Sequence, residues 1–229
     1  EFRLHHHKLR YVKEYCKLNN LNKLFFDTEK PRIGIISTGK SFLDTKLGLE
    51  KIGINKKVAN KIGIKFLKIA MPWPLEDTVI EEFAENLEKI IVVEEKRSII
   101  ETQVKEILFN KNLKVKVVGK KDELSNDLFI SSGALDPGEI GLKIYQIIKD
   151  LELPEEINNF SKQLKSLTES TNSNISLKRI PHFCSGCPHN TSTRIPKGSR
   201  AITGISCAYL VEHMERDNEG FSQMGSEGA

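Results

Sequence analysis

The chain has few of the features that mark membrane or secreted proteins. None of its apolar runs approaches the roughly 18 residues that a membrane-spanning helix needs. The N-terminus lacks the succession of basic, apolar and small-residue segments that defines a secretory signal peptide. These absences predict a cytoplasmic protein without a membrane partner. The four cysteines include a C-x-x-C pair, which favours metal or cluster chemistry over disulfides in such a chain.

The chain also lacks a large excess of charge of one sign. The chain has 35 Lys and Arg against 31 Asp and Glu, for a net charge of +4, and the two signs alternate along it. This pattern is typical of a solvated mixed-charge surface and predicts no nucleic-acid partner. Neither a G-x-G-x-x-G nor a Walker pattern is present, so a nucleotide-binding loop is not indicated. The 38% of hydrophobic residues is enough for a sizeable core.

Short apolar runs alternate with amphipathic segments through residues 31–150. The apolar runs predict strands at residues 33–36, 66–70, 90–93 and 115–118. The amphipathic segments between and after them predict helices at residues 42–49, 56–62, 76–87, 98–109 and 136–149. Strands and helices in alternation predict an α/β fold: an open, mostly parallel sheet with helices on both faces. The fully apolar run 90–93 is expected at the centre of the sheet.

The composition divides the chain into four parts. Residues 1–30 are predicted to be a helical lead-in, in which Cys16 is a small buried hydrophobe on the stripe of Leu9, Val12 and Leu18. Residues 31–150 are the α/β domain, and 151–180 are a polar linker with one helix at 155–164. Residues 181–229 begin a second domain. These 49 residues are too few to bury a stable core, so we expect a truncated chain or one that needs a partner.

Polar residues follow two of the predicted strands, where the functional edge of a parallel sheet lies. Ser37 and Thr38 precede Gly39 and a helix, so they either cap that helix or help to hold an anion. Glu94 and Glu95 follow the most apolar strand, and they either do acid–base work, contact a neighbouring domain or cap a helix. Trp73 stands between two prolines and is expected to pack at a domain boundary.

The strongest chemical signal is the segment Cys184-Ser-Gly-Cys187-Pro-His189, followed by Cys207. Two thiolates three residues apart on a turn that contains Gly186 can both reach one metal. Cys207 would be the third sulfur donor, after a short predicted strand at 200–205. A fourth donor is needed for tetrahedral zinc or for a cubane cluster, and His189 is the nearest one in the chain. The residues alone leave three alternatives open: an iron–sulfur oxidoreductase, a zinc-stabilised binding module, and a non-catalytic α/β interaction module.

Several motifs together resemble one family, the indolepyruvate:ferredoxin oxidoreductases. These are the long fused form within the thiamine-pyrophosphate-dependent 2-oxoacid:ferredoxin oxidoreductases. The motifs occur in the family's order along the chain, and the cysteine motif is the most specific of them. The segments that carry the resemblance are residues 34–40, 71–76, 91–97, 118–120, 181–193 and 204–207.

The resemblance implies a fold and a set of ligands. Residues 31–150 would be a transketolase C-terminal-like domain, and residues 181–229 would open the thiamine-pyrophosphate-binding domain. Cys184, Cys187 and Cys207 match positions that hold a [4Fe–4S] cluster in related enzymes, with the fourth cysteine beyond Ala229. His189 and the backbone of two further segments would face the cofactor pocket; the residues of those segments are Gly204, Ile205, Ser206, Met224 and Gly225.

The implied reaction is the oxidative decarboxylation of an arylpyruvate to an acyl-CoA. Its cofactors would be thiamine pyrophosphate, Mg²⁺ and the cluster, which suits electrons that leave one at a time. Its partners would be the 2-oxoacid substrate, coenzyme A, ferredoxin, missing segments of the same polypeptide and further copies in a homo-oligomer. These residues lack the family's Gly-Asp-Gly motif, which binds magnesium and diphosphate. They also lack the N-terminal domain that carries the family's pyrimidine-activating glutamate, so we expect the isolated chain to be inactive.

Overall fold

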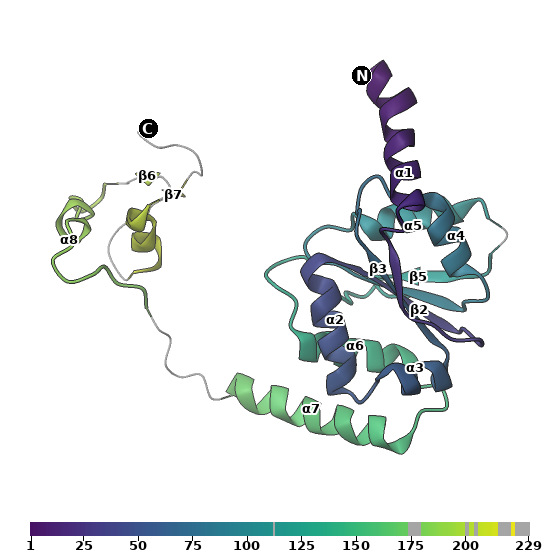
Figure 1. Cartoon of the computed structure of the whole chain (residues 1–229). Helices are drawn as coiled ribbons and strands as arrows, with labels where there is room; N and C mark the ends of the chain where they lie inside the picture. Colours follow the sequence, from purple (N-terminus) through teal and green to yellow (C-terminus); the bar gives the residue numbers. More distant parts are fainter. Residues whose placement is uncertain (112, 174–179, 200–201, 204–205, 215–220, 223–229) are drawn as a thin grey trace. The chain divides into compact units, whose positions relative to one another are not determined.

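The chain forms two compact units, Glu1–Asn172 and Ser173–Ala229. The structure is a computed structural model that describes residues 1–111, 113–173, 180–199, 202–203, 206–214 and 221–222. Figure 1 shows both units, which are described one at a time below.

A five-stranded sheet with the strand order β1-β3-β2-β4-β5 organises the first unit. Strand β2 runs parallel to β3 and β4, and β4 runs parallel to β5, whereas β1 lies antiparallel to β3 at the edge. The prediction of an open, mostly parallel sheet is therefore confirmed. The apolar run in β4 is interior, as expected, although β2 holds the middle place. The strands are β1 (Lys23–Phe26), β2 (Ile33–Thr38), β3 (Ile64–Ile69), β4 (Lys89–Val93) and β5 (Lys116–Val118).

Helices cover both faces of this sheet, as Figure 1 shows. One face packs against α2 (Gly39–Lys51), α3 (Lys56–Ile62) and α6 (Pro137–Ile148), and the other against α4 (Asp77–Ala84) and α5 (Ile100–Phe109). Neighbouring residues of a strand point to opposite faces, so Ile35 lies in the first core and Ile36 in the second. Both residues are fully buried, which explains why β2 reads as a continuous apolar run.

Helices α2 and α6 approach each other at two glycines. A Cβ atom on Gly48 would lie 2.5 Å from the carbonyl oxygen of Pro137, and one on Gly141 would lie 2.5 Å from the carbonyl oxygen of Gly48. Both obstacles are backbone atoms, which cannot rotate away as a side chain can. Glycine at these positions therefore permits the close helix contact that completes the first core.

The N-terminal segment departs from the predicted helical lead-in. A π-helical turn, η1 (Leu4–Lys8), leads into α1 (Leu9–Leu18), and Cys16 is buried as predicted. Leu18 is 82% exposed and Val12 is 39% exposed, however, so the predicted apolar stripe is wrong at both positions. The same segment also supplies β1, which adds to the sheet through pairing with β3. That pairing joins residues that are far apart in the sequence, so the local pattern of apolar residues does not predict it.

Residues 151–180 contain a longer helix than the sequence predicts. Helix α7 (Glu155–Ser173) extends past residue 164 and buries Ile157 in the first core. Ser161, one turn further along, is also buried. Much of the segment that reads as a polar linker is thus part of the first unit.

Short elements make up the described part of the second unit. They are α8 (His189–Ser192), β6 (Ile202–Thr203), the 3-10 helix η2 (Cys207–His213) and β7 (Phe221–Ser222), with β6 and β7 paired in parallel. Across the described residues of both units, no helix has the length and apolar character needed to cross a bilayer.

Candidate functional site

At the carboxyl edge of the sheet, the two hydroxyls that follow β2 bind neighbouring strands. Ser37 Oγ donates to the carbonyl oxygen of Val93 at 2.8 Å, and Thr38 Oγ1 donates to that of Ile69 at 2.8 Å. Thr38 occupies the N-cap position of α2, but its side chain makes no capping hydrogen bond. The interpretation of these hydroxyls as helix caps is therefore wrong, because they join β2 to β4 and to β3 instead.

Glu94 caps a helix, which is one of the roles that the sequence left open. Its carboxylate accepts hydrogen bonds from the backbone N–H groups of Ile99 (3.0 Å), Ile100 (2.9 Å) and Glu101 (3.0 Å). The side chain reaches the start of α5 from the end of β4 and is buried. A carboxylate at a helix N-terminus satisfies N–H groups that have no partner within the helix. Glu95 lies 3.4 Å from Lys40 Nζ and is less buried.

Lys120 is a residue of this edge that sequence reasoning missed. It follows β5, and its Nζ donates to the carbonyl oxygens of Glu94 at 2.5 Å and Ile130 at 3.2 Å. Burial lowers the Lys120 pKa, while the nearby carboxylates of Glu94 and Glu101 oppose that change. Lys120 thus ties the ends of β4 and β5 to the loop at residue 130. Lys120 lies in the family-like segment 118–120, but no pattern in the sequence assigned it a role.

The loop that carries Trp73 is held from α5. The side chain of Gln103 donates to the carbonyl oxygen of Pro72 and accepts from the N–H of Leu75, each at 2.8 Å. The Trp73–Pro74 peptide bond is cis. Trp73 itself is 58% exposed, so its predicted place at a domain boundary stays a prediction.

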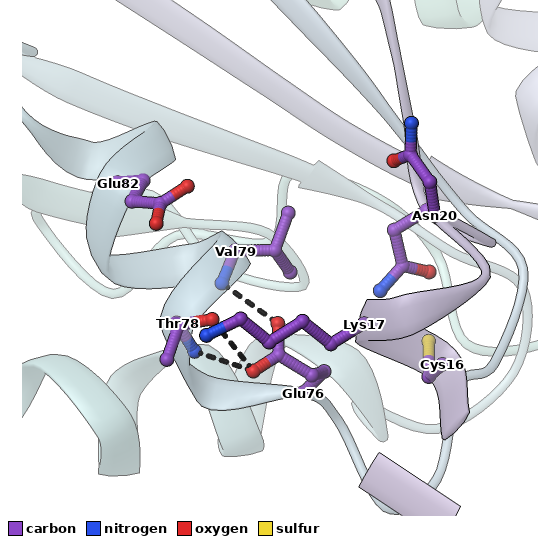
Figure 2. Close-up of a pocket in the computed structure, with 8 residues that line it drawn as sticks. Cys16, Lys17, Asn20, Glu76, Thr78, Val79 and Glu82 are labelled. Atoms are coloured by element: carbon purple, nitrogen blue, oxygen red, sulfur yellow. Dashed lines mark hydrogen bonds between the residues drawn. The ribbon is translucent and has the colours of Figure 1, made fainter. Parts of the chain in front are cut away.

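A cavity of about 180 Å³ lies between the end of α1 and the start of α4. Figure 2 shows the side chains that line it. Glu76 caps α4 there, accepting from the N–H groups of Thr78 and Val79 at 2.9 Å each. Cys16 lines the same cavity, yet it is only 1% exposed, and burial raises the pKa of its thiol. A buried thiol with a raised pKa is a poor nucleophile, so the interpretation of Cys16 as a packing residue is confirmed.

The second unit presents the C-x-x-C segment as a turn. The N–H of Cys187 donates to the carbonyl oxygen of Cys184 at 3.1 Å, and Gly186 adopts a φ of +74° between them. Cys184 is exposed and Cys187 is partly exposed. Both thiols are free, as are those of Cys16 and Cys207. The turn thus offers two accessible thiols three residues apart.

The thiols differ enough in exposure to predict their reactivity. In the native chain, iodoacetamide should modify Cys184 and Cys207 at least about tenfold faster than Cys16, because the first two thiols are exposed, whereas Cys16 is buried and burial raises the pKa of its thiol. Peptide mass spectrometry after timed quenching would give the individual rates. The matched measurement in denaturant should bring all rates together. Equal rates in the native chain would contradict the burial of Cys16.

The remaining predicted site residues lie in several places. Ser206 caps η2, where its Oγ accepts from the N–H of Ala208 at 3.1 Å, and Cys207 follows it, exposed. His189 starts α8, with its ring centroid 5.4 Å from that of Phe183. Among the residues that the structure describes, no three or more His, Cys, Asp or Glu side chains gather as a metal site. Four predicted cofactor residues lie outside the described residues: Gly204, Ile205, Met224 and Gly225.

Comparison with known proteins defines the class of the first unit. The family model described as "Indolepyruvate oxidoreductase domain" matches residues 23–174, which is more than half of the chain. The chain belongs to this family of oxidoreductase domains.

Individual relatives carry the family's name. The chain is 29% identical over 187 residues to indolepyruvate oxidoreductase subunit IorA of Pyrococcus abyssi, covering 80% of this chain and 26% of that protein. It is 26% identical over 208 residues to the subunit of the same name from Methanothermobacter marburgensis, covering 89% and 29%. The chain therefore spans about a quarter of the length of the curated relatives it matches.

Two solved structures are also similar. One is a 2-oxoglutarate:ferredoxin oxidoreductase from Magnetococcus marinus, with a TM-score of 0.40 and 17% identity, covering 62% of this chain and 23% of that one. The other is a split gene transketolase, with a TM-score of 0.38 and 14% identity, covering 56% and 41%. Scores this low support no assignment.

Proposed function

We propose that this chain is the part of a 2-oxoacid oxidoreductase that supplies cysteine ligands to an iron–sulfur cluster beside a thiamine pyrophosphate pocket. Family membership supports the oxidoreductase class. The observation that carries the proposal is the turn at Cys184–Cys187, which presents two accessible free thiols. In this proposal Cys207 is the third ligand, and a fourth comes from outside the chain.

The two thiols of the turn would supply two of the four ligands that a cubane iron–sulfur cluster needs. Thiolates are the ligands that iron–sulfur clusters use, and the two on this turn are three residues apart and reach the surface. A Cβ at Gly186 would meet no atom within 4 Å, so the space over the turn is open. Cys207 is exposed and free as well, but it does not join the other two in the described residues. The fit therefore rests on Cys184 and Cys187.

The proposed reaction is the oxidative decarboxylation of an arylpyruvate such as indolepyruvate to an acyl-CoA, with ferredoxin as electron acceptor. The names of the relatives support indolepyruvate as the substrate. When bound, thiamine pyrophosphate would stabilise the carbanion and the cluster would accept electrons singly. The cysteines of this chain would hold the cluster, and the sheet unit would pack beside the active site of a complete, oligomeric enzyme.

The proposed cofactor pocket would be formed by His189 and five further residues of the second unit. Of its six predicted residues, His189 and Ser206 lie in the described part of the second unit, at the starts of α8 and η2. His189 is two residues after Cys187, so a cofactor that contacts it would lie near the thiols. Mg²⁺ stays a prediction from the resemblance, and we propose no residue of this chain as its ligand.

Metal analysis tests the proposal. Protein purified without oxygen should contain iron and acid-labile sulfide and show the brown absorption of thiolate-ligated clusters. The Cys184→Ser variant should lose most of the iron, because serine does not replace a thiolate ligand, whereas Cys16→Ser should keep it, because Cys16 is buried in the other unit. Stoichiometric zinc without sulfide would overturn the cluster and support the zinc-stabilised module instead.

A further inference from the structure

We propose that Asn190 is the positioning residue that fixes the spacing of the Cys184 and Cys187 thiolates for metal binding. The inference rests on the proposed function of this turn as a thiolate site, but it does not depend on which thiophilic metal binds. Asn190 itself touches no metal in this proposal and acts through the backbone of the two cysteines.

One residue holds the carbonyl groups of both cysteines. The side-chain Nδ2 of Asn190 donates to the carbonyl oxygen of Cys184 at 3.1 Å. The backbone N–H of the same residue donates to the carbonyl oxygen of Cys187 at 3.0 Å. Asn190 therefore binds the turn at its first and its last residue.

The bond from the side chain is the one that a substitution can remove. The carbonyl oxygen of Cys184 accepts two hydrogen bonds, from Cys187 N–H within the turn and from Asn190 Nδ2 outside it. Without the second bond, the carbonyl group of Cys184 keeps the bond from Cys187 within the turn. Ser185 and Gly186 are both exposed, so packing does not compensate for the loss.

Asn190 is in turn fixed by the segment that follows the cysteines. Its backbone lies in α8, where the N–H of Thr193 donates to the carbonyl oxygen of His189 at 3.2 Å. The hydroxyl of Thr193 donates to the same oxygen at 2.5 Å, and Thr193 is buried. The amide of Asn190 thus projects from an anchored backbone onto an exposed turn.

A held turn binds metal more tightly than a loose one. A turn that is already held in one conformation spends less binding free energy on ordering the loop between its two thiolates when a metal binds. Residues that orient metal ligands without touching the metal typically contribute 10- to 100-fold in affinity. Because a single neutral hydrogen bond is lost here, we expect the lower end of that range, about tenfold.

The test uses Co²⁺ as the probe, because its thiolate charge-transfer absorption reports both affinity and the number of thiolates bound. The chain is titrated with Co²⁺ without oxygen, alongside Asn190→Ala, Asn190→Gln and the control Thr191→Ala. Thr191 is the exposed neighbour of Asn190 in α8. We expect Asn190→Ala to bind Co²⁺ about tenfold more weakly with less charge-transfer absorption per ion. Asn190→Gln, which keeps the amide donor, should recover part of both, and Thr191→Ala should match the wild type.

The outcomes separate this inference from the proposed function. If Asn190→Ala binds Co²⁺ with wild-type affinity and absorption, or if Thr191→Ala weakens binding equally, the role of Asn190 is refuted whatever metal the native protein holds. If the purified wild type lacks iron but the pattern of Co²⁺ affinities is as expected, the cluster assignment fails and the positioning role stands. A wild type that shows no thiolate absorption with Co²⁺ refutes both. Far-ultraviolet circular dichroism of each variant checks that the fold is kept.

Discussion

Replacing Phe66 by alanine should lower the free energy of unfolding of the sheet unit by about 3–5 kcal/mol. Phe66 lies in β3, fully buried, at the centre of an aromatic cluster. Its ring centroid is 5.1 Å from that of Phe42 and 5.9 Å from that of Phe26. Alanine would remove these contacts and leave a cavity between α2 and the sheet, which the backbone of an interior strand cannot close.

Urea unfolding followed by tryptophan fluorescence measures this effect. The single tryptophan, Trp73, lies in the first unit, so its signal follows that unit and not the second. Phe109→Ala is the matched control, because Phe109 is 85% exposed and its loss should cost less than about 0.5 kcal/mol. The midpoint should fall for Phe66→Ala with little change in slope. Similar midpoints for the two variants would contradict the described core.

Replacing Glu94 by alanine should destabilise the same unit by about 3 kcal/mol, because three N–H groups at the start of α5 lose their acceptor together. The site is buried, so water does not freely replace the carboxylate. Glu94→Gln should have an intermediate effect, since an amide offers one acceptor oxygen and turns its NH₂ group toward backbone donors. Hydrogen exchange should show the loss locally, as weaker protection of the first turn of α5.

Glu95→Ala is the control for this prediction. Glu95 is the adjacent residue of the same type, but its carboxylate forms an ion pair at 3.4 Å with an exposed lysine, Lys40. Exposed pairs of this kind contribute about 0–1 kcal/mol. A cost for Glu95→Ala equal to that for Glu94→Ala would show that general charge at the end of β4, and not the cap on α5, sets the stability.

Much of the α/β unit could be predicted because its signals are local. The helix at 56–62 matches α3 residue for residue, with Asn55 as its cap and Gly63 in the left-handed conformation after it. The helix predicted at 136–149 is α6, which Asp136 caps and which has Pro137 in its first turn. Apolar runs gave β2, β3, β4 and β5 to within a few residues. Caps, glycines and periodicity act over a few residues, so they can be read without knowing the fold.

The features that the sequence did not predict depend on contacts between residues that are far apart in the sequence. Strand β1 forms because its backbone pairs with the edge of β3. Helix α7 is longer than predicted because one of its faces packs against the first core. The bond from Ser37 to Val93 spans 56 positions, which is why its hydroxyl joins strands and does not cap the nearby helix. Lys120 belongs to the carboxyl edge only because β4 and β5 are neighbours.

The sequence by itself determined the family, the α/β class and the C-x-x-C spacing of two cysteines, because motif spacing and hydrophobic period are properties of the chain. The tertiary structure decided which carboxylate caps α5, which hydroxyls join strands, and which thiol is buried out of reach. It also showed that one asparagine holds both cysteines of the turn. Those roles depend on which groups meet after folding, and a hydrogen bond or a buried surface exists only where two segments come together in space.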